Sequence, residues 1–237
     1  RIVIVTDPGS PLDVASRAVG YKVFNADPNV GGRYSALTAF GLVPSGLAGV
    51  DISDLLVSAV SASDLLGSDS VENPGLWLGA LLARSVNGSG FKDKFLIQSD
   101  GLAGFGDWVE QLVAESTGKE DKGILPVVVE SIAPEISNLP ADTLLIRFGS
   151  EVSGNTDASF HGGLGELFLL WEYATVIAGY LQGINPFDQP NVESAKIAAR
   201  ALLDSPVSST EVDFVDGGVA VKSYGFELTG STLDSAI

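Results

Sequence analysis

Apolar segments alternate with amphipathic segments along the first part of this chain, and turns rich in glycine and proline separate them. Runs of β-branched residues predict strands, and Ser10 followed by Pro11 predicts the start of a helix. The expected order is a strand at 1–6, a helix at 11–19, a strand at 21–26, a glycine-bearing turn at 29–33 and a helix at 34–43. This alternation with short links favours a parallel sheet covered by helices.

The pattern from 45 to 87 is helical, with predicted helix starts at Asp51, Ser61 and Asn73. Further along, the pattern predicts strands at 93–98, 123–130 and 143–148, and helices at 107–116, within 163–183 and at 191–204. The tail alternates around Asp216–Gly218, which is a hairpin signal.

These elements divide the chain into three expected parts. Residues 1–88 form the later part of a first α/β domain with its linking helices, and residues 89–204 form a second α/β domain. Residues 205–237 form a tail with a short hairpin, and the junction between the two domains falls near Asn87–Gly90.

Composition narrows the possible functions. The 237 residues include 30 acidic and 13 basic side chains, and the net charge of −17 disfavours nucleic acid and anionic membranes as partners. Cysteine is absent and there is one histidine, so thiolate chemistry and multi-imidazole metal sites are excluded, and a reducing, cytoplasmic location is expected. The apolar stretch 163–183 contains Glu166, Glu172 and Gln182, which predicts a buried helix and not a membrane span.

Three segments carry candidate chemistry. In the first, Gly31-Gly32-Arg33 follows a strand and opens a helix, where free N–H groups and the helix dipole favour an anion or a developing oxyanion. A tight turn with a surface arginine is the alternative interpretation. In the second, Glu115 lies in the last turn of a helix, against the dipole, and this placement is one way to make a carboxylate a base. A solvated glutamate beside Lys119 is the alternative there.

The third segment, Gly183–Lys196, is a polar turn between two helices. It carries Gln189 before a helix entry and Lys196 more than one turn into that helix, where an ordinary exposed lysine is the alternative. His161, in a glycine-flanked loop, has no carboxylate near it in the sequence and is assigned no role.

Taken in order, the three segments resemble phosphoglucose isomerases. Gly31–Ser35 is similar to the family's V-G-G-R-[YF]-S run, Glu115–Lys119 to its E-S-N-G-K run with Thr117 in place of asparagine, and Gly183–Lys196 to its G-I-N-P-F-D-Q…V-E-x-x-K signature. Phe105–Leu112 and Leu164–Glu172 also match helices of the family. The compact form resembles the short actinobacterial type, including forms fused to transaldolase.

The resemblance implies an α/β fold of two SIS-type units, each a parallel sheet flanked by helices, in a homodimer. It implies interconversion of glucose 6-phosphate and fructose 6-phosphate through a cis-enediol, in glycolysis and gluconeogenesis, with no metal or organic cofactor. By position, Glu115 would be the base, Arg33 would stabilise the enediolate and Lys196 would assist ring opening, while Gly31, Gly32, Gln189 and Lys119 would bind the sugar phosphate.

The chain also departs from the family's pattern. The histidine segment used for ring opening has no counterpart between Lys119 and Leu164, and the N-terminal phosphate-binding loops have none at all. We therefore expect a fragment whose first domain is incomplete and whose isolated activity is weak. A non-catalytic SIS module that binds a sugar phosphate and regulates a partner is the alternative function.

Overall fold

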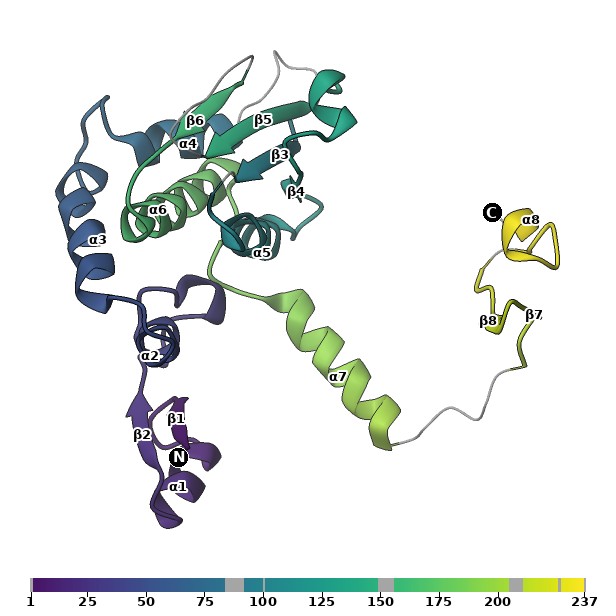
Figure 1. The fold of residues 1–237 in the computed structure, drawn as a ribbon, viewed down its shortest axis with the longest axis horizontal. Helices are drawn as coiled ribbons and strands as arrows, with labels where there is room; N and C mark the ends of the chain where they lie inside the picture. Colours follow the sequence, from purple (N-terminus) through teal and green to yellow (C-terminus); the bar gives the residue numbers. More distant parts are fainter. Residues whose placement is uncertain are drawn as a thin grey trace. The chain divides into compact units, whose positions relative to one another are not determined.

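The computed structural model describes residues 2–83, 92–99, 101–148, 156–204, 211–225 and 227–236. They form two units, Arg1–Gln189 and Pro190–Ile237, which are described in turn (Figure 1). The predicted junction at Asn87–Gly90 lies outside the described residues, so the predicted boundary between the two domains stays a prediction.

The first unit begins with a two-stranded parallel sheet. Strands β1 (Val3–Thr6) and β2 (Lys22–Asn25) pair in parallel and are joined by helix α1 (Pro11–Ala18), as the sequence predicts. Ser10 caps α1 by accepting a hydrogen bond from the Asp13 N–H, and Pro11 takes the first helical position, where its missing N–H costs nothing.

The predicted helix at 34–43 is wrong in its position. A 3₁₀ turn, η1 (Gly32–Tyr34), comes first, and helix α2 (Ala39–Leu47) begins later. The Ser35 hydroxyl donates to Gly32 O and closes the 3₁₀ turn, and Thr38 caps α2 by accepting from the Phe40 N–H. The hydroxyl residues that separate the two elements therefore act as caps and are not part of one helix.

The described residues after α2, up to residue 83, contain two helices where the sequence predicts three helix starts. Helix α3 (Ile52–Leu66) runs unbroken through the predicted start at Ser61, and helix α4 (Pro74–Leu82) begins at the predicted Asn73 cap. Ser61 and Ser63 donate to carbonyls three residues earlier in α3, so these serines bond back to their own helix and cap no new one.

The main sheet of the first unit has four parallel strands in the order β4-β3-β5-β6. Its strands are β3 (Lys94–Ser99), β4 (Leu125–Val128), β5 (Thr143–Phe148) and β6 (Ala158–Phe160). Helix α5 (Phe105–Thr117) joins β3 to β4, a short 3₁₀ turn η2 (Pro134–Ser137) precedes β5, and helix α6 (Leu164–Gln182) follows β6. This confirms the predicted α/β class with parallel sheets flanked by helices. The loop predicted around His161 is wrong in its first part, because Ala158–Phe160 forms strand β6.

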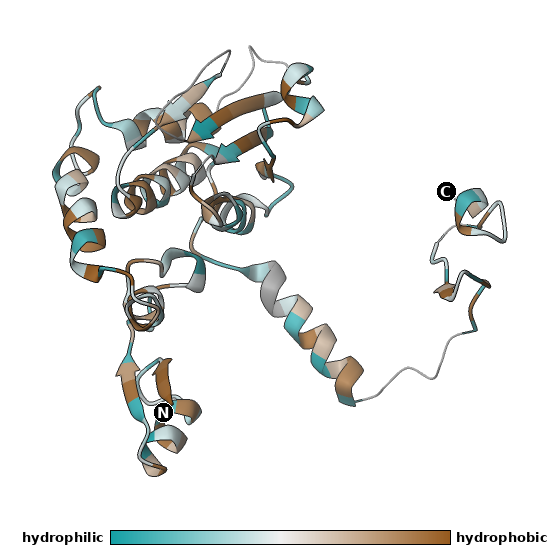
Figure 2. Cartoon of the chain, in the orientation of Figure 1, coloured by the Kyte–Doolittle hydropathy of each residue, from teal (hydrophilic) through white to brown (hydrophobic). Residues whose placement is uncertain are grey.

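The core lies between this sheet and helices α5 and α6. Trp171 of α6 is fully buried, with its ring 5.8 Å from that of Phe95 on β3 and 5.6 Å from that of Phe148 on β5. Figure 2 shows the apolar character of the central strands. Burial of large aromatic side chains is the main force that fixes the helices to the sheet.

Helix α6 is the one described helix long and apolar enough to cross a membrane by length and composition. Its residues Trp171, Ala174 and Ala178 are fully buried, and a Cβ added to Gly165 or Gly179 would collide with α3 or with Pro186. In this fold it packs as a core helix, in line with the prediction.

The second unit contains helix α7 (Pro190–Asp204), a hairpin and helix α8 (Leu233–Ala236). Strands β7 (Phe214–Asp216) and β8 (Val219–Val221) pair antiparallel around Gly217 and Gly218, which both have positive φ. The predicted hairpin is confirmed, because these two glycines supply the left-handed conformations that a two-residue turn requires. Helix α8 was not predicted.

Candidate active site

The candidate site forms where η1, the end of α5 and the segment after α6 meet. We call this last segment, residues 183–189, the elbow loop. Gly183 ends α6 in the left-handed conformation, with φ of 68°, and its N–H bonds back to Tyr180 O. That reversal directs the following residues back toward α5 and η1.

Arg33 is buried at the centre of this site, with a side chain 1% exposed. Its Nε donates to Ser116 Oγ at 2.7 Å, and its Nη2 donates to Pro186 O at 2.6 Å and Asp188 O at 3.2 Å. The guanidinium also lies over the ring of Tyr34, 5.3 Å from its centroid. The alternative of a surface arginine is therefore wrong, since a fixed set of acceptors holds this cation away from water.

Glu115 lies in the last turn of α5, and its side chain is 23% exposed. Its Oε1 is 3.7 Å from Arg33 Nη1, and its Oε2 accepts from Gln111 Nε2 at 3.3 Å. One face of the carboxylate therefore meets a buried cation while the group stays accessible to a ligand.

Gln189 links the base candidate to the arginine. With its amide oriented so that both groups are satisfied, Nε2 donates to Glu115 Oε1 and Oε1 accepts from Arg33 Nη1, each at 2.7 Å. Gly31 lies beside this amide, because a Cβ there would stand 3.4 Å from one of its two terminal atoms, whereas a Cβ on Gly32 would meet nothing within 4 Å. Neither glycine has a positive φ, so backbone freedom explains neither of them, and only Gly31 lies close to the amide.

Lys119 is also buried, with a side chain 2% exposed. Its Nζ donates to Asn185 O at 2.8 Å, to Asp188 O at 2.6 Å and to Asp188 Oδ1 at 2.6 Å. All three acceptors belong to the elbow loop, so Lys119 does not form the solvated pair with Glu115 that was the alternative interpretation.

Two residues of the site were missed from the sequence. Ser116 is fully buried and accepts from Arg33 Nε and, at 3.1 Å, from the Tyr34 hydroxyl. Burial raises the pKa of that tyrosine, so it stays a neutral donor at ordinary pH. Both residues stand inside the quoted motifs, but only their contacts across the fold show what they do.

Thr117, which replaces the family's asparagine, has a structural place. Its hydroxyl donates to Val113 O at 2.8 Å and accepts from the Ile124 N–H at 3.0 Å. It thus ties the end of α5 to the residue before β4.

The remaining candidates lie elsewhere. Lys196 belongs to α7 in the second unit, so its role stays a prediction, and His161 is exposed between β6 and α6. Among the described residues, no group of three or more histidine or acidic side chains is arranged to hold a metal ion.

Comparison with known proteins identifies the relatives of this chain. The glucose-6-phosphate isomerase of Clostridium tetani is 30% identical over 86% of this chain and 58% of its own length, and that of Listeria monocytogenes is 30% identical over 87% and 58%. This chain is related to the glucose-6-phosphate isomerases. It spans somewhat more than half the length of these relatives, and no family model matches it.

Solved structures share the fold. A hypothetical protein from Thermus thermophilus superposes with a TM-score of 0.72 at 24% identity, covering 85% of this chain and 62% of that one. A glucose-6-phosphate isomerase from Chlamydia trachomatis superposes with a TM-score of 0.71 at 20% identity, covering 85% and 52%. The α/β architecture described above is therefore one that a glucose-6-phosphate isomerase adopts.

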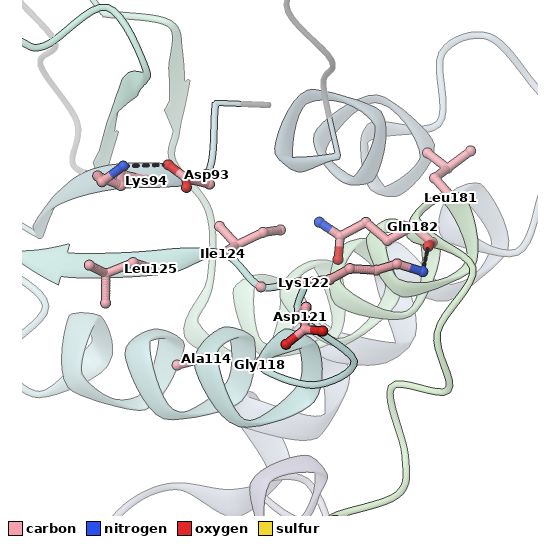
Figure 3. A pocket seen from close by; sticks show the side chains of 11 residues that line it. Asp93, Lys94, Ala114, Gly118, Asp121, Lys122, Ile124, Leu125, Leu181 and Gln182 are labelled. Atoms are coloured by element: carbon pink, nitrogen blue, oxygen red, sulfur yellow. Dashed lines mark hydrogen bonds and ion pairs between the residues drawn. The ribbon is translucent and has the colours of Figure 1, made fainter. Parts of the chain in front are cut away.

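A cavity of about 650 Å³ lies on another side of α5, and none of the seven predicted site residues lines it (Figure 3). Its walls include Lys94 and Leu125, which begin β3 and β4, together with Ala114 and Gly118 at the end of α5. The end of α5, with Glu115, is thus at the amino-terminal edge of the main sheet. The usual preference of ligands for the carboxyl edge of open parallel sheets therefore does not distinguish this cavity from the candidate site. The candidate active site is defined by its polar contacts and not by this cavity.

Proposed function

We propose that the full-length protein is an aldose-ketose isomerase that interconverts glucose 6-phosphate and fructose 6-phosphate. The observation that carries this proposal is the pairing of Glu115, an accessible carboxylate, with Arg33, a buried cation, 3.7 Å apart and bridged by Gln189. The relationship to glucose-6-phosphate isomerases supplies the substrate class.

The chemistry follows from these positions. Glu115 takes the proton from C2 of the open-chain aldose, the C–H electron pair forms the C1–C2 double bond, and the carbonyl electrons move to O1. Arg33 Nη1 stabilises the negative charge on the enediolate oxygen, in a dry setting where such a contact is strongest. A proton moves from O2 to O1, and Glu115 returns its proton to C1 to give the ketose. The carbonyl itself acidifies the neighbouring C–H bond, so these steps use no metal or organic cofactor.

The other site residues have separate tasks in this proposal. Gln189 and the small Gly31 and Gly32 shape the space beside the reacting carbons, and Lys196 assists ring opening before proton transfer. We further propose a cytoplasmic homodimer that works in glycolysis and gluconeogenesis. The net charge of −17 disfavours nucleic-acid and membrane partners, so we propose none.

The proposal is tested by deuterium uptake from heavy water into fructose 6-phosphate, with and without Glu115→Gln. We expect the full-length protein to exchange and the variant to lose at least ~100-fold in rate, because glutamine keeps the shape of the side chain but cannot take a proton. Absence of exchange in the unmodified protein would overturn the proposal and favour the non-catalytic sugar-phosphate module. Equal exchange in both proteins would remove Glu115 as the base.

A further inference from the structure

The elbow loop is held by two buried cations from other elements. Arg33 donates hydrogen bonds to the carbonyls of Pro186 and Asp188. Lys119 donates to the carbonyls of Asn185 and Asp188 and to the Asp188 carboxylate. Arg33 also reaches Gln189 and lies near Glu115, whereas the acceptors of the Lys119 ammonium all belong to the elbow loop. The two cations therefore have different positions relative to the chemistry.

The hydrogen-bonding capacity of Lys119 is fully used. An ammonium group has three N–H donors, and Nζ has three acceptors between 2.6 and 2.8 Å. The side chain is 2% exposed, so a ligand would have to displace one of these bonds in a dry environment. Removing a partner from a buried cation is costly. Arg33 is equally buried, but among the described residues its Nη1 meets only the side chains of Glu115 and Gln189, which can rearrange around a substrate. Two of the three Lys119 acceptors are backbone carbonyls, which cannot rearrange in this way, so direct binding of a sugar phosphate by Lys119 is unfavourable.

We infer that Lys119 is a positioning residue: it fixes the elbow loop so that Gln189 stands between Glu115 and Arg33, and it does not bind the substrate. Asp188, whose carbonyl and carboxylate it holds, directly precedes Gln189 in the chain, so a shift of one moves the other. The Gln189 amide makes two bonds of 2.7 Å, and short bonds of this kind tolerate little displacement. This role rests on the proposed isomerase function.

A double-mutant cycle tests the inference. Lys119→Met keeps the aliphatic stem and removes the ammonium, and Gln189→Ala removes the amide that Lys119 is inferred to position. In the full-length protein we expect Lys119→Met to lower kcat about 10- to 100-fold, as a misplacement of roughly 1 Å does, with little change in KM for fructose 6-phosphate. In the Gln189→Ala background the same change should lower kcat by less than about 3-fold, because its target is already gone.

Multiplicative losses in the two backgrounds would overturn the inference. So would a Lys119→Met variant that keeps kcat and raises KM in both backgrounds, since that is the signature of a direct substrate contact. An unmodified protein without isomerase activity would instead sink the proposed function, so the two failures are distinguishable.

Two further variants keep the test informative if Lys119→Met folds poorly. Lys119→Arg retains the charge but not the compact ammonium geometry, and we expect it to lower kcat, with smaller loss in the Gln189→Ala background. Asp188→Asn retains both carbonyl acceptors and alters only the half-exposed carboxylate, so its loss of kcat should be smaller than that of Lys119→Met. A larger loss for Asp188→Asn would contradict positioning through the backbone.

Discussion

Arg33 and Lys119 are two of only 13 basic residues, and both are buried although the chain is strongly acidic. A buried cation is tolerated only where acceptors surround it. Here both cations donate to backbone carbonyls of the elbow loop, and Asp188 O accepts from both. The loop and the cations therefore stabilise one another, and the geometry of the candidate site depends on both.

Ser116 and Thr117 are adjacent at the end of α5, and we expect substitution of the first to affect kcat and substitution of the second to affect stability. Ser116→Ala removes the acceptor of Arg33 Nε, so the guanidinium shifts and kcat should fall about 10-fold. Thr117→Val leaves the Ile124 N–H without its acceptor, which should lower the free energy of unfolding by about 1–3 kcal/mol and leave kcat nearly unchanged. Steady-state kinetics and urea denaturation of both variants measure the two effects. Equal kinetic losses in the two variants would show that the Arg33–Ser116 contact has no special role.

At the scale of single residues, the sequence motifs identify the site residues but do not predict their environments. Glycine before Arg33 is equally compatible with a surface turn, and the burial of the arginine results from contacts with residues more than 80 positions away. The role of Lys119 is hidden for the same reason, since its partners lie 66 and 69 positions further along the chain. Contacts of such long range depend on the packing of whole elements and leave no local pattern.

At the scale of elements, α6 combines a fully buried core face with polar atoms that lack partners. Glu172 Oε1 and Thr175 Oγ1 are buried without a hydrogen bond, and burial raises the pKa of Glu172 to about 8 from an ordinary value of 4.5. Protonation of this carboxyl is therefore how the helix keeps a charge out of the interior at neutral pH.

This burial makes stability depend on pH in a defined direction. Between 4.5 and about 8 the unfolded chain ionises Glu172 while the folded chain keeps it protonated. The contribution of the group to stability is thus complete below 4.5 and is lost as the pH rises toward 8. Glu172→Gln cannot ionise, so the variant should gain stability relative to the unmodified protein between about pH 5 and about pH 8. The urea unfolding midpoints of both proteins at about pH 5 and about pH 8 measure this gain, since the other titrating groups are common to both proteins. A difference in midpoint that stays the same at the two pH values would contradict the prediction.

The errors in predicted elements have physical causes. Serines in α3 look like caps in the sequence but donate to earlier carbonyls of the same helix, so the helix continues. Strand β6 has three residues, too few for a period of two to stand out, and it exists because it pairs with β5. Long segments with buried faces, such as α6 and β5, were predictable because their pattern extends over many residues.

At the scale of the whole molecule, two chemical steps are assigned to residues that can be tested apart. In the proposed function, Glu115 and Arg33 act on proton transfer, and Lys196 assists ring opening, which precedes it. An aldotetrose 4-phosphate has no free hydroxyl in position to close an ordinary sugar ring, so it undergoes enolisation without ring opening. Glucose 6-phosphate requires both steps. A comparison of the two substrates therefore isolates the contribution of Lys196.

We expect Lys196→Met to slow the conversion of glucose 6-phosphate about 100-fold, the range of a lost acid-base group, and to change proton exchange on the tetrose little. Glu115→Gln is the matched control, and it should abolish the reaction of both substrates because each passes through an enediol. Rates of deuterium uptake for the two substrates provide the measurement. If Lys196→Met slows both substrates equally, Lys196 acts in binding or in proton transfer, and another group opens the ring. If only the hexose is affected, ring opening does not require the histidine segment that this chain lacks, because a lysine on α7 performs that step.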